Sequence, residues 1–263
     1  MTSRVIIPIS NVGGPEFSFR LRNLKNLIKS IPLNIPITLV EQSVGNLSLY
    51  IYNIQNQSNL TKISVSFPVY NKCWLLNIGA VQSSEKYLLF IDADIQLPDS
   101  FFNVVTNTGI NDWCYLWSSL QYLNEHGSVV QIRNPRPGVS EGIVGYSREF
   151  FLKIGMWNEW MQELGGEDNE MCCRARFLSE KNNMIPILLT HAFHPLNSLN
   201  KAYKIGRQFR TPIYNSNIQI LEWCRRNTGK MIQILIENGN GLGQISSPIC
   251  SKKDLILGIE EIL

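Results

Sequence analysis

The sequence predicts an α/β protein whose mixed, mostly parallel β-sheet is flanked by helices. Apolar strand-like runs alternate with helical patterns along the first third of the chain, and this order gives parallel strands with helices on both faces of the sheet. A second observation is an apolar run over residues 87–91 that ends directly in two carboxylates, Asp92 and Asp94. A third is that 44% of the 263 residues are hydrophobic, enough for one core of ordinary domain size.

The first elements follow from the spacing of apolar residues. Residues 4–8 predict a strand, and residues 17–30 predict a helix with its leucines on one face and its basic residues elsewhere. Residues 37–40 predict a second strand, and a third lies within residues 49–70. A helix over residues 71–83 then precedes the strand that ends in the two carboxylates.

The pattern changes after the acidic strand. Residues 113–123 and 129–133 predict two longer strands, and Glu125-His126-Gly127 between them predicts the turn of a hairpin. A helix follows over residues 169–179, with apolar residues at spacings of three and four. The apolar run over residues 184–189 predicts one more strand.

The C-terminal part predicts a helical tail. We expect a main domain over residues 1–214 and a tail over residues 215–263 that packs on it. Within the tail, the patterns predict helices over residues 218–226 and 253–263.

Composition excludes several classes of function. A net charge of +3 and a pI near 8.5 are too mild, and the charges too evenly spread, for a nucleic-acid-binding protein. No apolar run reaches the roughly 18–20 residues of a membrane-spanning helix, and no secretory signal precedes the first strand. The six cysteines lack the spacing of a disulfide framework. We therefore expect a cytoplasmic protein with reduced thiols, and the sequence does not predict its oligomeric state.

The two carboxylates after the acidic strand predict a metal site. Strand periodicity places Asp92 and Asp94 on the same side of the chain, where their oxygens could converge on one divalent cation. The end of a sheet strand is also where open α/β folds bind ligands. The alternative is an Asx turn that closes on Pro98.

A second acidic cluster, Gly165-Gly166-Glu167-Asp168, opens the predicted helix over residues 169–179. Free backbone amides and the helix dipole at this end favour an ionised carboxylate that can accept a proton. The alternative is that Glu167 or Asp168 only caps the helix. Capping does not explain the glycine pair, which lets a ligand or another backbone approach closely.

Two of the three histidines, His191 and His194, follow the apolar run over residues 184–189. An imidazole added to two carboxylates favours manganese or another transition ion over magnesium. The alternative for each is an ordinary core or loop histidine.

In this order, the clusters resemble the beta-1,4-galactosyltransferases and their chondroitin-polymerase relatives, which are glycosyltransferases of the Rossmann-like GT-A fold. The resemblance covers roughly residues 4–200. Asp92-Ala93-Asp94 is similar to the family's metal-binding D-V-D, and Gly165 to Asp168 match its G-G-E-D. Residues 70–79 resemble its F-N-R-A-K-L-L-N-V-G segment, and residues 142–155 resemble its F-G-G-V-S-A-L-S-K segment.

The resemblance implies inverting transfer of a hexose or N-acetylhexosamine from a UDP-sugar donor to the hydroxyl of a saccharide acceptor. Asp168 would be the general base and Glu167 would hold the acceptor. Mn2+, or Mg2+ in its place, would be held by Asp94 with support from Asp92 and by His194, with His191 as a second candidate. Further contacts to the nucleotide-sugar are expected from Pro8, Glu41, Asn71, Lys72, Asn77, Asp92, Ala93 and Gly145.

Departures from the family pattern leave the sugars open. The family reads W-G-W-G-G-E-D, whereas this chain has Trp160 followed by Met-Gln-Glu-Leu before its glycine pair. One alternative is a retaining enzyme of the polypeptide N-acetylgalactosaminyltransferase type, which has D-x-H and G-G-E-N segments; Asp94 and Asp168 stand where that type has His and Asn. Another is a non-catalytic protein that binds a sugar or nucleotide-sugar.

Overall fold

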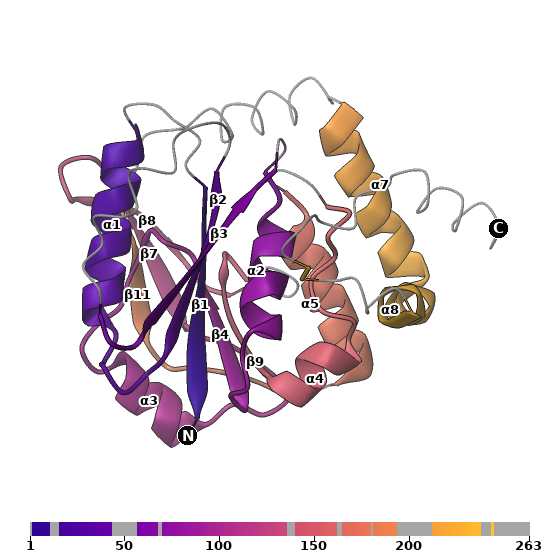
Figure 1. Cartoon of the computed structure of the whole chain (residues 1–263), viewed down its shortest axis with the longest axis horizontal. Coiled ribbons are helices and arrows are strands. Elements are labelled where there is room, and N and C mark those ends of the chain that lie inside the picture. Colours follow the sequence, from indigo (N-terminus) through magenta and orange to yellow (C-terminus); the bar gives the residue numbers. More distant parts are fainter. Residues whose placement is uncertain are drawn as a thin grey trace.

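The computed structural model contains two β-sheets and helices on both sides of the larger one (Figure 1). It describes residues 2–10, 16–43, 57–67, 70–135, 140–161, 165–179, 181–193, 212–237 and 243–244. The large sheet consists of β1 (Ser3–Ser10), β2 (Ile37–Ser43), β3 (Leu60–Ser66), β4 (Tyr87–Ile91), β6 (Trp113–Tyr115), β9 (Ile143–Ser147) and β10 (Asn182–Met184). The small sheet consists of β5 (Ile95–Gln96), β7 (Ser119–Leu123), β8 (Val129–Arg133) and β11 (Leu188–His191). The helices are α1 (Glu16–Ser30), α2 (Lys72–Val81), α3 (Phe101–Thr108), α4 (Arg148–Lys153), α5 (Glu167–Leu178), α7 (Pro212–Arg226) and α8 (Thr228–Glu237).

The large sheet is mixed and mostly parallel, as predicted. Its strand order is β10-β6-β9-β4-β1-β2-β3. The strands β3, β2, β1 and β4 run parallel to one another, β9 runs antiparallel to both β4 and β6, and β10 is parallel to β6. The nearly continuous apolar sequence of β1 explains its place inside the sheet, because a strand covered on both faces needs apolar residues on both.

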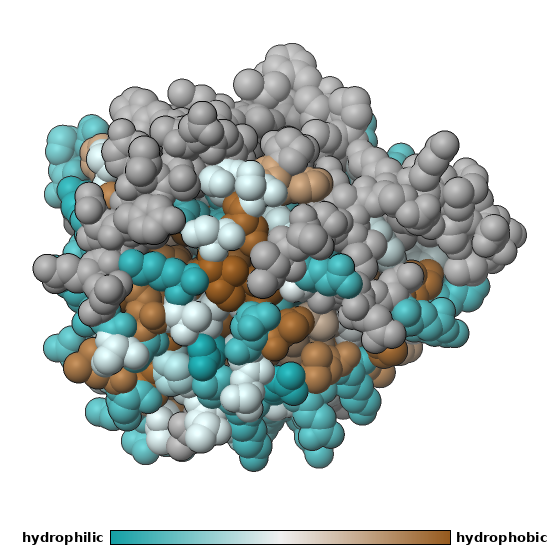
Figure 2. Space-filling model, viewed as in Figure 1, coloured by the Kyte–Doolittle hydropathy of each residue, from teal (hydrophilic) through white to brown (hydrophobic). Residues whose placement is uncertain are grey.

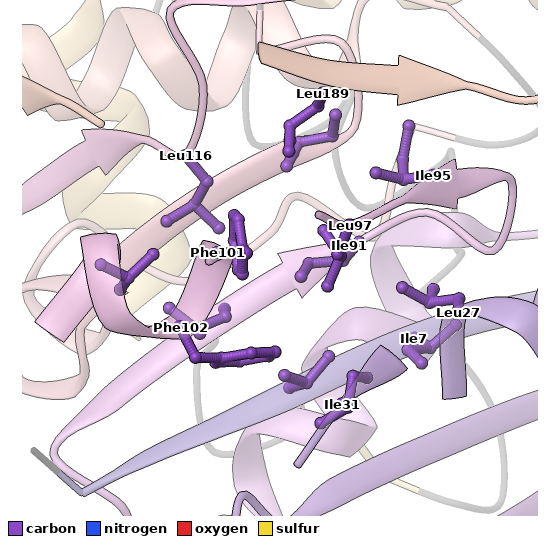
Figure 3. Close-up of a cluster of buried hydrophobic side chains, with 14 of the residues drawn as sticks. Ile7, Leu27, Ile31, Ile91, Ile95, Leu97, Phe101, Phe102, Leu116 and Leu189 are labelled. Atoms are coloured by element: carbon purple, nitrogen blue, oxygen red, sulfur yellow. The ribbon is translucent and has the colours of Figure 1, made fainter. Parts of the chain in front are cut away.

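The two faces of β1 pack against different helices. Ile7 and its neighbours on one face contact apolar side chains of α1 and α3, including Leu27 and Phe101 (Figure 3). Ile6 points to the other face and joins a second cluster with α2, α4 and α5. This alternation is the period of two that a buried strand imposes. Figure 1 shows α1 and α3 on one side of the sheet and α2, α4 and α5 on the other.

The helices α7 and α8 belong to the second cluster. Ile220 and Cys224 of α7 and Met231 and Leu235 of α8 are buried in the same core as the aromatic residues of β4 and β9. The helix α7 begins at Pro212, three residues before the predicted tail. The helices α3 and α8 were not predicted from the sequence, and the helix predicted over residues 253–263 lies outside the described residues.

The long strand predicted over residues 113–123 is wrong, because the chain passes there from one sheet to the other. It divides into β6 in the large sheet and β7 in the small sheet. Between them, the backbone N–H groups of Ser118 and Ser119 both donate to the carbonyl of Ile187. The hairpin itself is confirmed, since β7 and β8 are antiparallel and Gly127 has the left-handed φ of 79° that the turn requires.

The strand predicted over residues 184–189 divides in the same way. Its first part ends β10, and its last part begins β11 in the small sheet. Pro186 lies between the two and cannot donate a ladder hydrogen bond. Both sheet changes bring the chain from the large sheet to a small sheet that contains His191.

The remaining predicted elements are found with shifted ends. The predicted helix over residues 71–83 is α2, whose first turn is capped by Asn71, the acceptor of the Trp74 N–H. The third strand is Leu60–Ser66. In the part of the chain that the structure describes, no helix has the length and apolar character needed to cross a membrane. Hydrophilic and hydrophobic side chains are interspersed over the face drawn in Figure 2.

Candidate active site

The first predicted carboxylates lie at the carboxyl end of β4, the central strand of the large sheet. Asp92 follows β4 directly, and its backbone N–H donates to the carbonyl of Gly142 at 3.1 Å. The chain then turns, with the Ile95 N–H donating to the carbonyl of Asp92 at 3.2 Å, so that β5 joins the small sheet. Asp94 therefore lies where the two sheets meet, and its carbonyl accepts from the Ala192 N–H at 2.8 Å.

The second acidic pair opens α5, as the sequence predicts. The helix begins at Glu167, and the capping position before it is Gly166, whose φ of 91° is left-handed. Neither acid therefore occupies the capping position. Asp168 instead accepts a hydrogen bond from the Gly142 N–H through Oδ2 at 3.1 Å, and Glu167 accepts one from the Gly165 N–H at 2.9 Å.

Gly142 joins the two acidic segments. Its N–H bonds the Asp168 carboxylate and its carbonyl bonds the Asp92 N–H. A Cβ atom at this position would lie 1.9 Å from Oδ2 of Asp92, and the φ of 74° is one that L residues rarely adopt. Gly142 lies in one of the family-like segments, but no spacing rule in the sequence predicts this contact.

Lys72 is the cation of this cluster. Its Nζ lies 2.9 Å from Oδ2 of Asp92 and 3.8 Å from Oε1 of Glu167, and its side chain is 8% exposed. The sequence predicts that Lys72 contacts the diphosphate. In the structure Lys72 begins α2 and its Nζ bridges the two acidic segments, so its charge already balances protein carboxylates.

Burial and mutual repulsion shift the pKa values of these groups. Burial acts to lower the pKa of Lys72, but the charges of Asp92, Asp168 and Glu167 raise it well above its usual value. Burial and the neighbouring Asp94 and Asp168 charges raise the pKa of Asp92 to about 6 against the opposing effect of Lys72. Burial and the Asp168 charge raise the pKa of Glu167 to about 7, again opposed by Lys72.

We expect Glu167 to make the protein less stable as the pH rises. Its pKa is about 7 in the folded chain and about 4.3 when unfolded, so between these values the folded state binds more protons. The free energy of unfolding should fall as the pH passes from about 5 to about 8. Urea unfolding of Glu167→Gln should show a flatter dependence over this range. Equal slopes in both proteins would contradict the assignment.

Asp94 and His191 form a separate pair. His191 Nε2 lies 3.8 Å from Oδ2 of Asp94, and its Nδ1 lies 3.2 Å from the carbonyl of Ala192. Two donors each about 2.1 Å from one cation are at most about 4.2 Å apart, so this spacing fits two ligands of one metal ion. A ligating histidine commonly donates its other N–H to a backbone carbonyl, as Nδ1 is placed to do.

This pair alone is an incomplete metal site. Within the described ranges, no group of three or more His, Cys, Asp or Glu side chains is arranged to hold a metal ion. Asp92 faces Lys72. The favoured metal ligand, His194, lies outside the described residues, so of the two histidine candidates the structure gives contacts for His191.

Three of the predicted nucleotide contacts are buried in structural roles. Asn71 caps α2 and donates to the carbonyl of Glu159. Asn77 donates to the Trp157 carbonyl and the Glu159 carboxylate, and it accepts from the Trp157 N–H. Gly145 lies in β9, where a Cβ atom would come within 3.1 Å of three apolar side chains. These contacts give the three residues structural roles, and their contacts with a nucleotide stay predictions.

Of the other predicted contacts, Pro8 and Glu41 lie in strands of the large sheet, and Ala93 lies in the turn that follows β4. Pro8 is buried in β1 and pairs with Val40 of β2. Glu41 of β2 is 4% exposed; burial raises its pKa, and its carboxylate accepts from the Ser64 hydroxyl at 3.4 Å. Ala93 is partly buried against the cluster that contains Ile7.

Comparison with known proteins finds a weakly similar curated sequence and solved structures that share the fold. No family model matches the chain. A curated relative, the putative polypeptide N-acetylgalactosaminyltransferase 13 of Drosophila melanogaster, is 21% identical over 188 residues, which are 57% of this chain and 33% of the relative. The chain thus spans about a third of the length of the curated relative that it matches.

Two solved structures share the fold. GalNAc-T7 with UDP, GalNAc and Mn2+ matches 89% of this chain and 57% of its own, with a TM-score of 0.56 and 14% identity. Residues 1–349 of S. aureus TarS with UDP-GlcNAc match 84% of this chain and 70% of their own, with a TM-score of 0.54 and 14% identity. The GT-A fold predicted from the sequence is thereby confirmed, while the narrower resemblance to beta-1,4-galactosyltransferases and chondroitin polymerases stays a prediction. The chain has the fold of the GT-A glycosyltransferases.

Proposed function

We propose that this protein transfers a hexose or N-acetylhexosamine from a UDP-sugar to a saccharide hydroxyl, with inversion at the anomeric carbon and dependence on a divalent cation. Both solved relatives are complexes with UDP or a UDP-sugar, and the curated relative is named as a glycosyltransferase. In the acidic cluster, Asp92 lies at the carboxyl end of the parallel strand β4, and this end of the strands is the ligand-binding edge of open α/β sheets.

The observation that carries the proposal is the environment of Asp168. One carboxylate oxygen, Oδ2, is fixed by the Gly142 N–H. The other, Oδ1, is buried and has no hydrogen-bond partner among the described residues. A buried carboxylate oxygen without a donor is costly, and an acceptor hydroxyl would supply that donor. In this role Asp168 accepts the hydroxyl proton as the acceptor oxygen attacks the donor sugar.

Glu167 and Lys72 support this base. Glu167 has a pKa of about 7, so near neutral pH it can either donate a hydrogen bond to the acceptor or accept one. Lys72 offsets part of the repulsion among Asp92, Glu167 and Asp168. The Asp94–His191 pair, with diphosphate oxygens completing the set, would hold Mn2+ or Mg2+; such an ion neutralises charge that develops on the UDP leaving group.

A retaining N-acetylgalactosaminyltransferase is the second candidate, because the curated relative carries that name. Inversion is favoured by Asp168, since an inverting reaction needs a base for the acceptor hydroxyl. The two candidates predict different products. Proton NMR of the freshly formed glycoside would show the anomeric configuration, and retention of the donor configuration would refute our assignment of Asp168 as the base.

The activity itself is tested by UDP release from a panel of UDP-sugars, with Mn2+ or with EDTA, using water and simple saccharides as acceptors. We expect one donor to give metal-dependent release that saccharides accelerate. A protein that binds UDP in a calorimeter but releases none from any donor, with or without acceptor, would instead be a nucleotide-sugar-binding protein, the third candidate.

We expect Asp94→Ala to weaken metal-dependent binding of UDP. The substitution removes one of the two paired donors, so the gain in UDP affinity on adding Mn2+ should fall by more than about tenfold. Calorimetry with and without Mn2+ measures this gain. The exposed Asp99 supplies a control, Asp99→Ala, which should retain it. An unchanged gain in Asp94→Ala would place the metal elsewhere.

A further inference from the structure

Tyr122 of β7 is the register partner of His191 in the neighbouring strand β11 of the small sheet. Its ring stacks on the His191 imidazole, with 4.7 Å between the ring centroids and 24° between the planes. The guanidinium of Arg133, from the neighbouring strand β8, lies over the same phenol ring at 4.7 Å. The imidazole near Asp94 thus packs on a ring that a second strand holds in place.

The Tyr122 hydroxyl also has a fixed partner. It donates to Oε2 of Glu141 at 2.9 Å, and Oε1 of Glu141 accepts from Nη1 of Arg133 at 2.8 Å. Glu141 has a φ of 51°, unusual for a residue other than glycine, and it precedes Gly142. One network of side chains therefore reaches both His191 and the loop that bonds Asp92 and Asp168.

We propose that Tyr122 is a positioning residue for the metal site, acting through His191. The inference rests on the proposed function, since it assigns His191 as a metal ligand beside Asp94. A side chain with 23% exposure at the end of a short strand has several accessible rotamers. Stacking on Tyr122 selects the rotamer that directs Nε2 to Asp94, and the Glu141–Arg133 pair fixes the Tyr122 ring.

A purely structural role for Tyr122 makes a different prediction. Aromatic stacking stabilises a fold by about 0.5–1.5 kcal/mol whether or not a metal binds. A structural tyrosine would therefore change the free energy of unfolding and leave the metal affinity of the folded protein unchanged. Metal affinity, measured without turnover, separates the two roles.

The test is a titration of the intact protein with Mn2+ in the presence of UDP. The signal of the free Mn2+ in electron paramagnetic resonance reports how much of the ion is bound. Tyr122→Leu removes the stack and should weaken Mn2+ binding by about 10–100-fold, the usual effect of losing a partner of a metal ligand. Tyr122→Phe keeps the ring and should stay closer to wild type than Tyr122→Leu. Gln131→Ala is the matched control, because Gln131 is exposed and pairs with Tyr122 in the β7–β8 ladder.

Wild-type Mn2+ affinity in folded Tyr122→Leu would overturn the inference. If Tyr122→Leu does not fold, Arg133→Met replaces it in the test. A weakening of Mn2+ binding by about two- to fivefold, the size of an exposed cation–π contact, supports the inference. An unchanged Mn2+ affinity in Arg133→Met refutes it. His191→Ala separates this result from a failure of the proposed function. If His191→Ala binds Mn2+ as the wild type does, the proposed metal site is wrong; if it loses Mn2+ and Tyr122→Leu does not, only the inference about Tyr122 is wrong.

Discussion

Asp168→Asn should abolish glycosyl transfer while the affinities for UDP and Mn2+ stay nearly unchanged. The amide has the same shape as the carboxylate, and its oxygen can still accept the Gly142 N–H. It cannot take a proton from the acceptor hydroxyl at neutral pH. A general base contributes roughly a hundred- to ten-thousandfold to the rate, so kcat should fall by at least about a hundredfold.

Asp168 and Asp94 have different proposed roles, so their substitutions should have different effects. The measurements are the rate of UDP release with donor and acceptor at saturation and the UDP affinity by calorimetry with Mn2+. Asp168→Asn should lower the rate of UDP release only, and Asp94→Ala should lower both this rate and the UDP affinity. Asp99→Asn, at an exposed position, controls for the loss of one negative charge. Equal loss of UDP binding in Asp168→Asn and Asp94→Ala would refute the separate roles.

The secondary structure around the site could be predicted because short-range rules fix it. Apolar runs gave the strands β1, β2 and β4, and the acids at 167 and 168 marked the start of α5. The changes of sheet after β6 and after β10 were not predicted. In each case a single mostly apolar run continues from a strand of the large sheet into a strand of the small sheet. Pro186 was the available signal, because proline interrupts a ladder.

The site itself was predictable only in part. The acids at the ends of β4 and α5 were identified from their positions, yet which groups pair with them depends on contacts between distant segments. In the structure Lys72 faces Asp92 and Glu167, and Asn77 anchors the backbone of Trp157. Their expected contacts with the nucleotide stay predictions, but these protein partners were not predicted. Long-range contacts of this kind leave no pattern in a single sequence.

Gly142→Ala should destabilise the protein and remove its activity. The added Cβ would lie 1.9 Å from Oδ2 of Asp92, so either Asp92 or the loop must move. Movement of Asp92 disturbs its ion pair with Lys72, and movement of the loop disturbs the hydrogen bond that fixes Asp168. A fully buried ion pair broken on one side costs about 3–5 kcal/mol; the Asp92 side chain is 29% exposed, so the loss here should be smaller. This loss comes in addition to about 1–2 kcal/mol for a left-handed alanine.

Gly127→Ala isolates the backbone part of this cost. Gly127 has a similar φ of 79° in the β7–β8 turn, and a Cβ atom there would meet nothing within 4 Å. Urea unfolding should show a loss of about 1–2 kcal/mol in Gly127→Ala, with activity retained, and a clearly larger loss in Gly142→Ala. Equal losses in the two variants would mean that the contact with Asp92 relaxes without cost.

A double-mutant cycle then locates the clash. Asp92→Ala removes the atoms that the new Cβ would meet, so Asp92→Ala with Gly142→Ala should be less destabilised than the sum of the single variants. Residues in direct contact give coupling energies of about 0.5–3 kcal/mol, and we expect a value in this range. Simple additivity would show that Gly142→Ala acts through the loop backbone instead. The activity of Gly142→Ala would then depend only on how well the loop still holds Asp168, because that hydrogen bond comes from the Gly142 backbone.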